Sequence, residues 1–293
     1  MKYYIGIDGG GTKTAAIIQS EDGREAIITL PGSNNSYIGV EASLQIVKDA
    51  VMQLTNKLGA KISDVSGVFV GIAGATANNY IAVCSDMLTE LLPNAAVKVD
   101  VDVMNLLAML DGDGAALICG TGSICYANKG DTRTRIGGYA DFDGAGSGTF
   151  IGKDALMLSL KIYDGRKSDS LLNRMVIEKL GGQVHPNLSM LMKAERAYIA
   201  SFAPLVFRAA KSGDTHAKEI LSRNFEYLGE MVDRAAEILG TDTFTLVTGG
   251  GIMRDPMSDS MLLSYTKANP IIIYCDDQSR GALSMAKKLV GKN

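Results

Sequence analysis

Short apolar stretches that end at glycine-rich turns recur along the chain. Residues 3–7 are apolar and lead into Asp8, and the segment "TKTAAIIQ" that begins at Thr12 alternates loosely between apolar and polar positions. Alternation over so few residues, with threonine and isoleucine enriched, predicts β-strands. The glycines at 9–11 therefore join one strand to another strand, and "SEDGRE" after the second strand predicts a turn.

Longer segments show the helical period instead. Apolar residues recur every three to four positions in "EASLQIVKDAVMQLTNKLG" (41–59) and in "AKEILSRNFEYLGEMVDRAAEILG" (217–240). This spacing predicts amphipathic helices that pack one face against a core. Strands and helices alternate along the chain, which favours an α/β architecture.

Two further glycine clusters also follow apolar strands. "GAALICGTGSICYANKG" (114–130) again places a turn between two strands, and "FTLVTGGGIM" (244–253) ends a third apolar stretch in glycines. Two strand–turn–strand units about a hundred residues apart suggest an internal duplication.

The first glycine turn matches neither common nucleotide fingerprint. A dinucleotide loop opens a helix, and a Walker loop needs Gly-Lys-Ser/Thr, whereas Thr12 here precedes Lys13. A glycine turn between strands can instead direct backbone N–H groups at one phosphate, and Asp8 beside it is suited to hold Mg²⁺ directly or through water. A purely structural hairpin fits this stretch equally well, and Lys13 fits either a phosphate contact or an exposed hairpin position.

The three clusters together favour a nucleotide site. Two turns facing each other would hold the β- and γ-phosphates of ATP, and glycines in the third cluster would let an adenosine ring lie against the backbone. The residues expected at ATP are Gly9, Gly10, Gly11, Thr12 and Lys13 in the first turn, Gly120, Thr121, Gly122 and Ser123 in the second, and Thr248, Gly249, Gly250 and Gly251 in the third.

Phosphoryl transfer also needs a base for the acceptor hydroxyl. "AAVKVDVDVMNLLAML" offers Asp100 and Asp102, which follow an apolar strand and precede a predicted helix. An aspartate in this place is suited to catalysis, but it also has a structural role as a helix N-cap.

Composition narrows the classes of function. The 293 residues are 46% hydrophobic and 21% charged with a net charge of −3, which indicates a globular chain with a sizeable core. Basic blocks, a signal peptide and a membrane-length apolar run are missing, so nucleic-acid and membrane partners are not expected. The four cysteines lack Cys-x-x-Cys spacing, which favours buried thiols and a reducing, cytoplasmic location.

The order and spacing of Asp-Gly-Gly-Gly-Thr-Lys-Thr, Gly-Thr-Gly-Ser and Thr-Gly-Gly-Gly resemble the actin/Hsp70/sugar-kinase superfamily of ATPases. Within it, the chain resembles the BadF/BadG/BcrA/BcrD ATPase family nearly end to end, including the N-acetylglucosamine kinases. "GIAGA" (71–75), "IGKDALMLSLKIYDGRKSDSLL" (151–172) and "IASFAPLVFRAAKSGDTHAKEIL" (199–221) also resemble segments of that family.

This resemblance implies an α/β fold of two ribonuclease H-like, actin-like ATPase domains with ATP and Mg²⁺ in the cleft between them. The N-terminal domain would span residues 1–115 and take back the C-terminal helix at 279–293, and the second domain would span 116–278. Homodimers are common in the family, so the resemblance also allows a homodimer for this chain.

The resemblance also implies an ATP-dependent kinase that phosphorylates an amino sugar, most simply N-acetylglucosamine at its 6-OH. It selects Asp102 as the base, although Val101 replaces the asparagine that precedes it in the family, and places Gly213 near adenosine. Asn34 matches the family's sugar-binding asparagine. The family's Gly-Gly-Trp-Gly and Gly-Asp-Glu-Gly-Ser segments correspond to "GGYADFDGAGSG" (137–148), which is one residue shorter. Gly138, Tyr139 and Asp143 are therefore expected at the sugar, with Asp141 as the alternative carboxylate.

Two other functions stay open at this point. Some relatives in the family are iron–sulfur ATPases that activate radical dehydratases, although the cysteine-bearing loop of those proteins is not visible in this sequence. The altered segment at 137–148 also leaves room for a non-catalytic sugar or nucleotide sensor, because buried groups that match a substrate's hydroxyls dominate discrimination.

Overall fold

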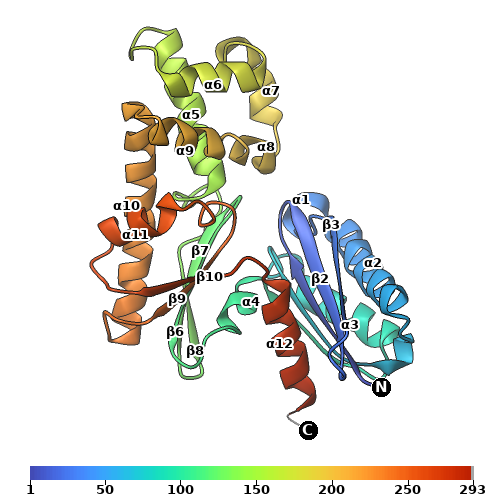
Figure 1. Ribbon diagram of the computed structural model, residues 1–293. Helices are drawn as coiled ribbons and strands as arrows, with labels where there is room; N and C mark the ends of the chain where they lie inside the picture. The colour runs from blue at the N-terminus through green and yellow to red at the C-terminus, as the bar shows by residue number, and fades with distance from the viewer. Residues whose placement is uncertain (292–293) are drawn as a thin grey trace. The chain divides into compact units, whose positions relative to one another are not determined.

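The computed structural model describes residues 1–291 and divides into two compact units. Unit 1 comprises residues 1–110 and 275–291, and unit 2 comprises residues 111–274. The chain therefore leaves unit 1 once and returns to it for its final helix (Figure 1).

Unit 1 is built on a mixed five-stranded sheet in the order β3-β2-β1-β4-β5. Its strands are β1 (Tyr3–Gly9), β2 (Lys13–Ser20), β3 (Glu25–Pro31), β4 (Val65–Ile72) and β5 (Ala96–Val101). The first three strands form an antiparallel meander, while β4 and β5 run parallel to β1. The first glycine turn thus joins two antiparallel neighbours, which confirms the predicted strand-to-strand connection.

Side chains of β1 alternate between two faces of this sheet, as the period of a strand requires. Ile5 and Ile7 are fully buried in a core shared with residues of α2 (Val40–Leu58) and α3 (Tyr80–Leu91). Gly6 lies on the other face, where a Cβ atom would come within 2.2 Å of the Leu283 nitrogen in α12 (Ser279–Val290). Asp8 belongs to the α12 face by the same alternation. The predicted helix at 41–59 is confirmed by α2.

Unit 2 repeats the strand topology of unit 1. Its sheet has the order β10-β9-β6-β7-β8. The strands are β6 (Gly114–Cys119), β7 (Ser123–Lys129), β8 (Thr132–Ile136), β9 (Thr245–Gly249) and β10 (Ile271–Tyr274). Again three strands form an antiparallel meander, and two strands pair in parallel beyond the first of them. The matching order and directions confirm the predicted duplication.

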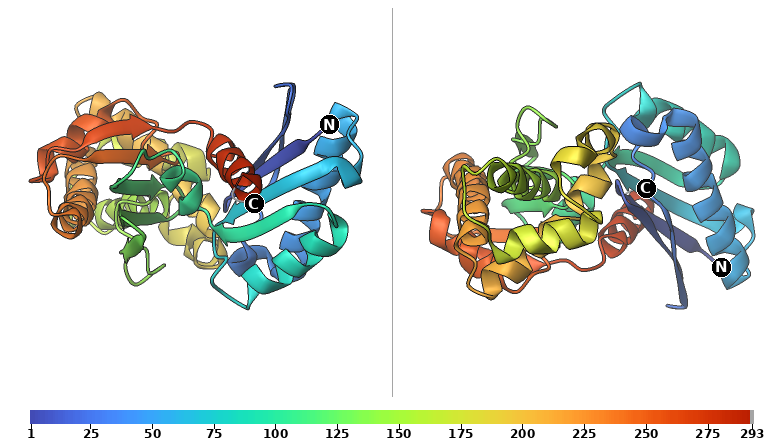
Figure 2. Two further views of the ribbon diagram at one scale, coloured as in Figure 1. Left: turned by 90° about the horizontal axis from the view of Figure 1, so that it is seen from below. Right: turned by 90° about the horizontal axis from the view of Figure 1, so that it is seen from above.

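The remaining helices of unit 2 lie mainly beyond the glycine-turn end of its sheet (Figures 1 and 2). They are α5 (Gly148–Tyr163), α6 (Leu171–Leu180), α7 (Leu188–Lys193), α8 (Arg196–Ala200) and α9 (Ala203–Lys211), with α11 (Met257–Tyr265) beside the long α10 (Thr215–Leu239). Asp214 begins α10 by accepting a hydrogen bond from the Ala217 N–H at 2.9 Å, and Gly240 ends the helix in the left-handed conformation. The helix predicted at 217–240 is therefore confirmed.

Short segments complete both units: α1 (Asn35–Ile38), α4 (Val103–Leu107) and two 3₁₀ turns, Ile62–Asp64 and His185–Asn187. All four cysteines are buried free thiols. Within residues 1–291, none of the helices combines the length and the apolar character that crossing a bilayer would take.

Candidate functional site

The first glycine turn of unit 1 is held by the segment that follows β3. The Gly10 N–H donates to the Lys13 carbonyl at 2.9 Å, which closes the turn, and the Gly10 carbonyl accepts from the Ser33 N–H at 3.0 Å. Position 9 requires glycine, because a Cβ atom there would come within 2.5 Å of the Ser33 hydroxyl oxygen. The Thr14 hydroxyl donates to the Pro31 carbonyl and so fastens β2 to the same segment. The turn is thus a closely packed, fixed structure.

Asp8 lies immediately before this turn and carries the most perturbed carboxyl group of unit 1. Burial, with a smaller contribution from the negative charge of Asp102, raises its pKa from 3.8 to about 7. A hydrogen bond from Asn105 and the nearby charge of Lys13 act in the opposite direction, but they are smaller effects. A carboxylate in such surroundings is unfavourable by itself and is stabilised by a bound cation.

Asn105 is a residue of this site that sequence reasoning missed. Its Nδ2 donates to Asp8 Oδ1 at 2.7 Å, from a fully buried position in α4. Two glycines make the room for it: a Cβ atom on Gly71 would meet Asn105 Oδ1 at 2.2 Å, and one on Gly281 would meet the Asn105 carbonyl at 1.8 Å. The sequence signal is therefore weak, because it consists of glycines that are distant from Asn105 along the chain.

The two candidate bases differ in their surroundings. Asp102 is the N-cap of α4 and accepts a hydrogen bond from the Val103 N–H at 3.0 Å. Asp100 is the penultimate residue of β5, where it lies 3.4 Å from the Lys98 ammonium and accepts from the Val101 N–H. Asp102 therefore has the capping role that the sequence allowed, and its charge also reaches Asp8. Its role as a base stays a prediction.

Asn34 reaches the first turn from the segment after β3. Its N–H donates to the Gly10 carbonyl at 3.3 Å, and its Oδ1 caps α1 by accepting from the Ser36 N–H at 2.9 Å. Gly74, in the predicted "GIAGA" segment, has a φ of +80°, and a Cβ atom there would lie 2.5 Å from Asn34 Oδ1. Unit 1 therefore gathers Asp8, Asn34 and the first turn into one place.

The second glycine turn is tied to the start of α5 in unit 2. The Gly120 carbonyl accepts from the Gly148 N–H at 2.7 Å, and the Thr149 hydroxyl donates to the Thr121 carbonyl at 2.7 Å. The Ser123 hydroxyl is buried and donates inward to the Ala145 carbonyl at 2.8 Å. The turn is thus anchored beside a helix N-terminus, a location that favours negative charge.

The third glycine cluster packs against the second. Gly250 has a φ of +93°, and a Cβ atom there would lie 2.3 Å from the Cys119 carbonyl, so only glycine fits. The buried Thr248 hydroxyl oxygen has no hydrogen-bond partner among residues 1–291. Gly213 lies in the turn between α9 and α10, and a Cβ atom there would meet open space. An ion pair of 2.7 Å between Lys211 and Asp255 connects the end of α9 with the segment that follows the third cluster.

The loop expected at the sugar contains a glycine in the left-handed region and a tyrosine that contacts an arginine. Gly138 has a φ of +76°, and a Cβ atom there would collide with Ile124 and Ser123, so only glycine fits. Arg135 donates to the Gly138 carbonyl, and its guanidinium lies 4.7 Å from the centre of the Tyr139 ring. The Tyr139 N–H donates to the Asp143 carbonyl at 3.1 Å. This loop is therefore closed on itself.

Its two carboxylates are engaged differently. Asp143 accepts a hydrogen bond from the Tyr227 hydroxyl, a partner that the sequence did not indicate, and burial together with this contact raises the Tyr227 pKa. Asp141 accepts from the Lys153 ammonium at 3.0 Å, and this contact lowers the Asp141 pKa, with Arg196 adding to the effect from 3.9 Å. Both candidates for the missing family carboxylate are thus held by protein groups.

The chain can now be placed among known proteins. The sequence profile of the BadF/BadG/BcrA/BcrD ATPase family matches residues 5–283. The chain belongs to this family. It is 29% identical to the N-acetylmuramic acid/N-acetylglucosamine kinase of Clostridium acetobutylicum, across 98% of this chain and 99% of that one. It is 28% identical to the N-acetyl-D-glucosamine kinase of Dictyostelium discoideum, across 96% of each.

Solved structures bear out the fold. A crystal structure from Chromobacterium violaceum, assigned as an N-acetylglucosamine kinase, matches with a TM-score of 0.76 at 24% identity and covers 99% of both chains. Structural neighbours share the arrangement of two mixed five-stranded sheets with helices, so the fold is that of the actin-like ATPases. The expected fold class is confirmed.

The family implies a magnesium ion, and the donors at Asp8 can be compared with that requirement. Within residues 1–291, no three His, Cys, Asp or Glu side chains are grouped closely enough to form a metal cage. Magnesium needs no such cage, because it keeps several waters and is bound through one or two carboxylates and the substrate's phosphates. A partly exposed Asp8 beside the charge of Asp102 fits this mode of binding.

Proposed function

We propose that this protein is an ATP-dependent kinase that phosphorylates an amino sugar, with N-acetylglucosamine at its 6-OH as the leading substrate. One observation carries the proposal: Asp8 and Asp102 lie close enough for each charge to act on the other, directly beside a glycine turn. A phosphoryl-transfer site needs a metal anchor, a base and amides at the phosphates, and Asp8, Asp102 and the glycine turn are chemically suited to these three tasks. The kinase relatives support the substrate class.

Each residue then has a definite task. Asp102 accepts the proton of the acceptor hydroxyl, and Asn34 holds the sugar through its amide. Asp8, oriented by Asn105, holds Mg²⁺, which would offset the charge of the phosphates when bound. In unit 2, the turn at 120–123 contributes N–H groups to phosphate, and the cluster at 248–251 supports adenosine, with Gly213 nearby.

The first experiment measures ADP production with magnesium across a panel of acceptors. The panel holds N-acetylglucosamine, glucosamine, N-acetylmuramic acid, N-acetylmannosamine and glucose. ADP production that requires one amino sugar supports the kinase and names its substrate. Hydrolysis that no sugar stimulates contradicts the proposal.

A matched pair of variants tests the base. Asparagine keeps the N-cap at position 102 but cannot take a proton, so Asp102→Asn should lower turnover by about 10²- to 10⁴-fold while ATP still binds. Asp100→Asn is the control, since Asp100 is paired with Lys98 and should be dispensable for transfer. Equal activity of both variants would mean that Asp102 is not the base.

A sensor without catalytic activity is the second candidate. It is favoured by Gly144 and Ala145, which stand where the resemblance leads us to expect an Asp-Glu pair. Saturable sugar binding without ADP production in the same panel would select it. The activator reading is disfavoured, because burial raises the pKa values of Cys119 and Cys125 and thereby opposes the thiolate form that metal clusters need.

A further inference from the structure

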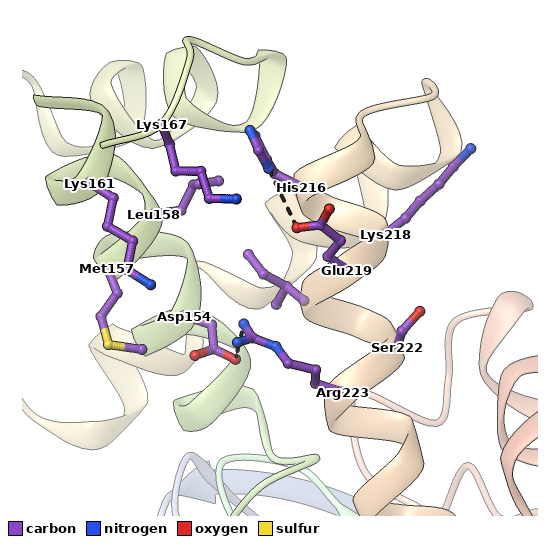
Figure 3. A pocket seen from close by; sticks show the side chains of 11 residues that line it. Asp154, Met157, Leu158, Lys161, Lys167, His216, Lys218, Glu219, Ser222 and Arg223 are labelled. Atoms are coloured by element: carbon purple, nitrogen blue, oxygen red, sulfur yellow. Dashed lines mark ion pairs between the residues drawn. The ribbon is translucent and has the colours of Figure 1, made fainter. Parts of the chain in front are cut away.

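A cavity of about 580 Å³ lies in unit 2 between α5 and α10, and the glycine turns contribute nothing to it (Figure 3). Its volume is in the range of sites for small ligands. Its lining is strongly charged and consists of Asp154, Met157, Leu158, Lys161, Lys167, His216, Lys218, Glu219, Ile220, Ser222 and Arg223. Four of these residues are permanent cations, against two acids, and because Lys218 points away, three cations face the cavity (Figure 3). The cavity is therefore positive, although the chain as a whole has a net charge of −3.

The cations come from three different segments and point toward a common space. Lys161 comes from α5, Lys167 from the loop after α5, and Arg223 from α10 (Figure 3). Within the described residues 1–291, neither Lys161 nor Lys167 has an ion-pair partner. Two unpaired ammonium groups and a guanidinium that face one space favour a negatively charged ligand there.

The two acids of the cavity differ in their partners, and Asp154 is the one that is fully engaged. Asp154 accepts a hydrogen bond from Asn224 Nδ2 at 2.9 Å and lies 3.6 Å from the Arg223 guanidinium. Glu219 lies 3.6 Å from His216 Nδ1, which is longer than a hydrogen bond. Within the described residues, neither acid forms an ion pair with Lys161 or Lys167.

His216 supplies a second, independent indication. Its side chain is only 14% exposed, and its Nδ1 is buried without a hydrogen-bond partner in the part of the chain that the structure describes. A buried polar atom left unpaired is costly and calls for an explanation in the structure. The ring faces the same cavity as Lys167 (Figure 3), so a ligand oxygen would satisfy it.

We propose that this cavity is a second anion site, which binds a phosphate-bearing small molecule. A phosphate group offers several oxygens to donors that converge from different directions, as ammonium, guanidinium and imidazole groups do here. The cavity is larger than a phosphate group alone, so a phosphorylated metabolite fits the remaining volume. This site is distinct from the glycine turns and does not depend on the kinase proposal.

Isothermal titration with glucosamine 6-phosphate and with inorganic phosphate tests this site. The informative variant is Lys161→Gln/Lys167→Gln, and the control is Lys218→Gln, because Lys218 is exposed and points away from the cavity (Figure 3). Loss of two charge-assisted contacts should raise the dissociation constant by about tenfold or more in the double variant. The control should bind as the wild type does.

The two ligands separate the sources of phosphate. Tighter binding of the sugar phosphate identifies an ester as the ligand, and equal binding identifies free phosphate. Equal affinity of wild type and double variant, or no saturable binding of either compound, overturns the proposal. If the double variant fails to fold, Lys167→Gln alone gives the same comparison, since Lys167 is exposed in its loop.

Discussion

Replacing Asp8 with asparagine should stabilise the metal-free protein at neutral and alkaline pH. The carboxyl group is raised to a pKa of about 7 by burial and by Asp102, so folding disfavours its charged form. Asparagine has nearly the same shape, cannot ionise, and can still accept the hydrogen bond from Asn105. The variant therefore removes an unfavourable charge and keeps the packing.

The sign and size follow from proton linkage. Between pH 3.8 and about 7, the folded protein holds a proton on Asp8 that the unfolded chain has released, so stability falls as pH rises through this window. A rise in pKa of about three pH units corresponds to about 4 kcal/mol at most. Because the Asp8 side chain stays partly accessible, we halve this value to about 2 kcal/mol. The loss is complete above pH 7 and vanishes below pH 4.

The assay is thermal unfolding of wild type and Asp8→Asn in EDTA from pH 4 to pH 8.5. The two melting temperatures should coincide at pH 4 and differ by about 4–8 °C at pH 8, with the variant higher. Asp111→Asn is the control, because Asp111 is exposed, and its profile should follow the wild type. Adding magnesium at pH 8 should raise the wild-type melting temperature more than that of Asp8→Asn.

Parallel pH profiles for wild type and Asp8→Asn would refute this reasoning. They would mean that the Asp8 carboxylate is solvated or paired well enough to ionise normally in the folded protein. A variant that is less stable at every pH would point to a structural role for the carboxylate beyond its charge. Either result would also weaken the assignment of Asp8 as the magnesium anchor.

Two further substitutions test packing and the substrate loop. Gly6→Ala should lower the free energy of unfolding by about 2 kcal/mol or more, because the new Cβ atom would meet the Leu283 backbone at 2.2 Å. The control is Gly182→Ala, whose Cβ atom would make only ordinary contacts, so its midpoint of urea unfolding should change little. Tyr227→Phe removes the hydroxyl that donates to Asp143, so the KM for the sugar should rise by about tenfold while the KM for ATP stays unchanged. An unaltered KM for the sugar would mean that Asp143 does not contact the acceptor.

Local patterns were sufficient to predict much of the architecture. A strand–turn–strand unit occupies about twenty consecutive residues, in which apolar and polar positions alternate on both sides of a glycine turn. The units β1–β2 and β6–β7 could therefore be predicted from the local sequence alone. The long helices α2 and α10 were readable for the same reason, since an amphipathic helix repeats its pattern over many turns. The duplication followed from comparing two such local units.

The missed features all depend on contacts between distant parts of the chain. Asn105 meets Asp8 across 97 residues, and Tyr227 meets Asp143 across 84. No local period marks such a pair, because each partner occupies an ordinary place in its own helix or loop. The glycines that accommodate Asn105 did not indicate its position either, because a close approach is recognised only when both contacting surfaces are known.

The duplication did not preserve the chemistry of the two units. At the end of β1 stand Asp8 and Gly9, whereas the equivalent end of β6 carries Ile118 and Cys119, with no carboxylate. A buried charge of the kind found at Asp8 lowers the stability of the fold, so a second such carboxylate would destabilise unit 2 without a second metal ion to bind. If the protein is the kinase that we propose, the charged groups of phosphoryl transfer would therefore lie in unit 1. The turn of unit 2 retains neutral donors, which suits it to holding phosphate rather than to activating the acceptor.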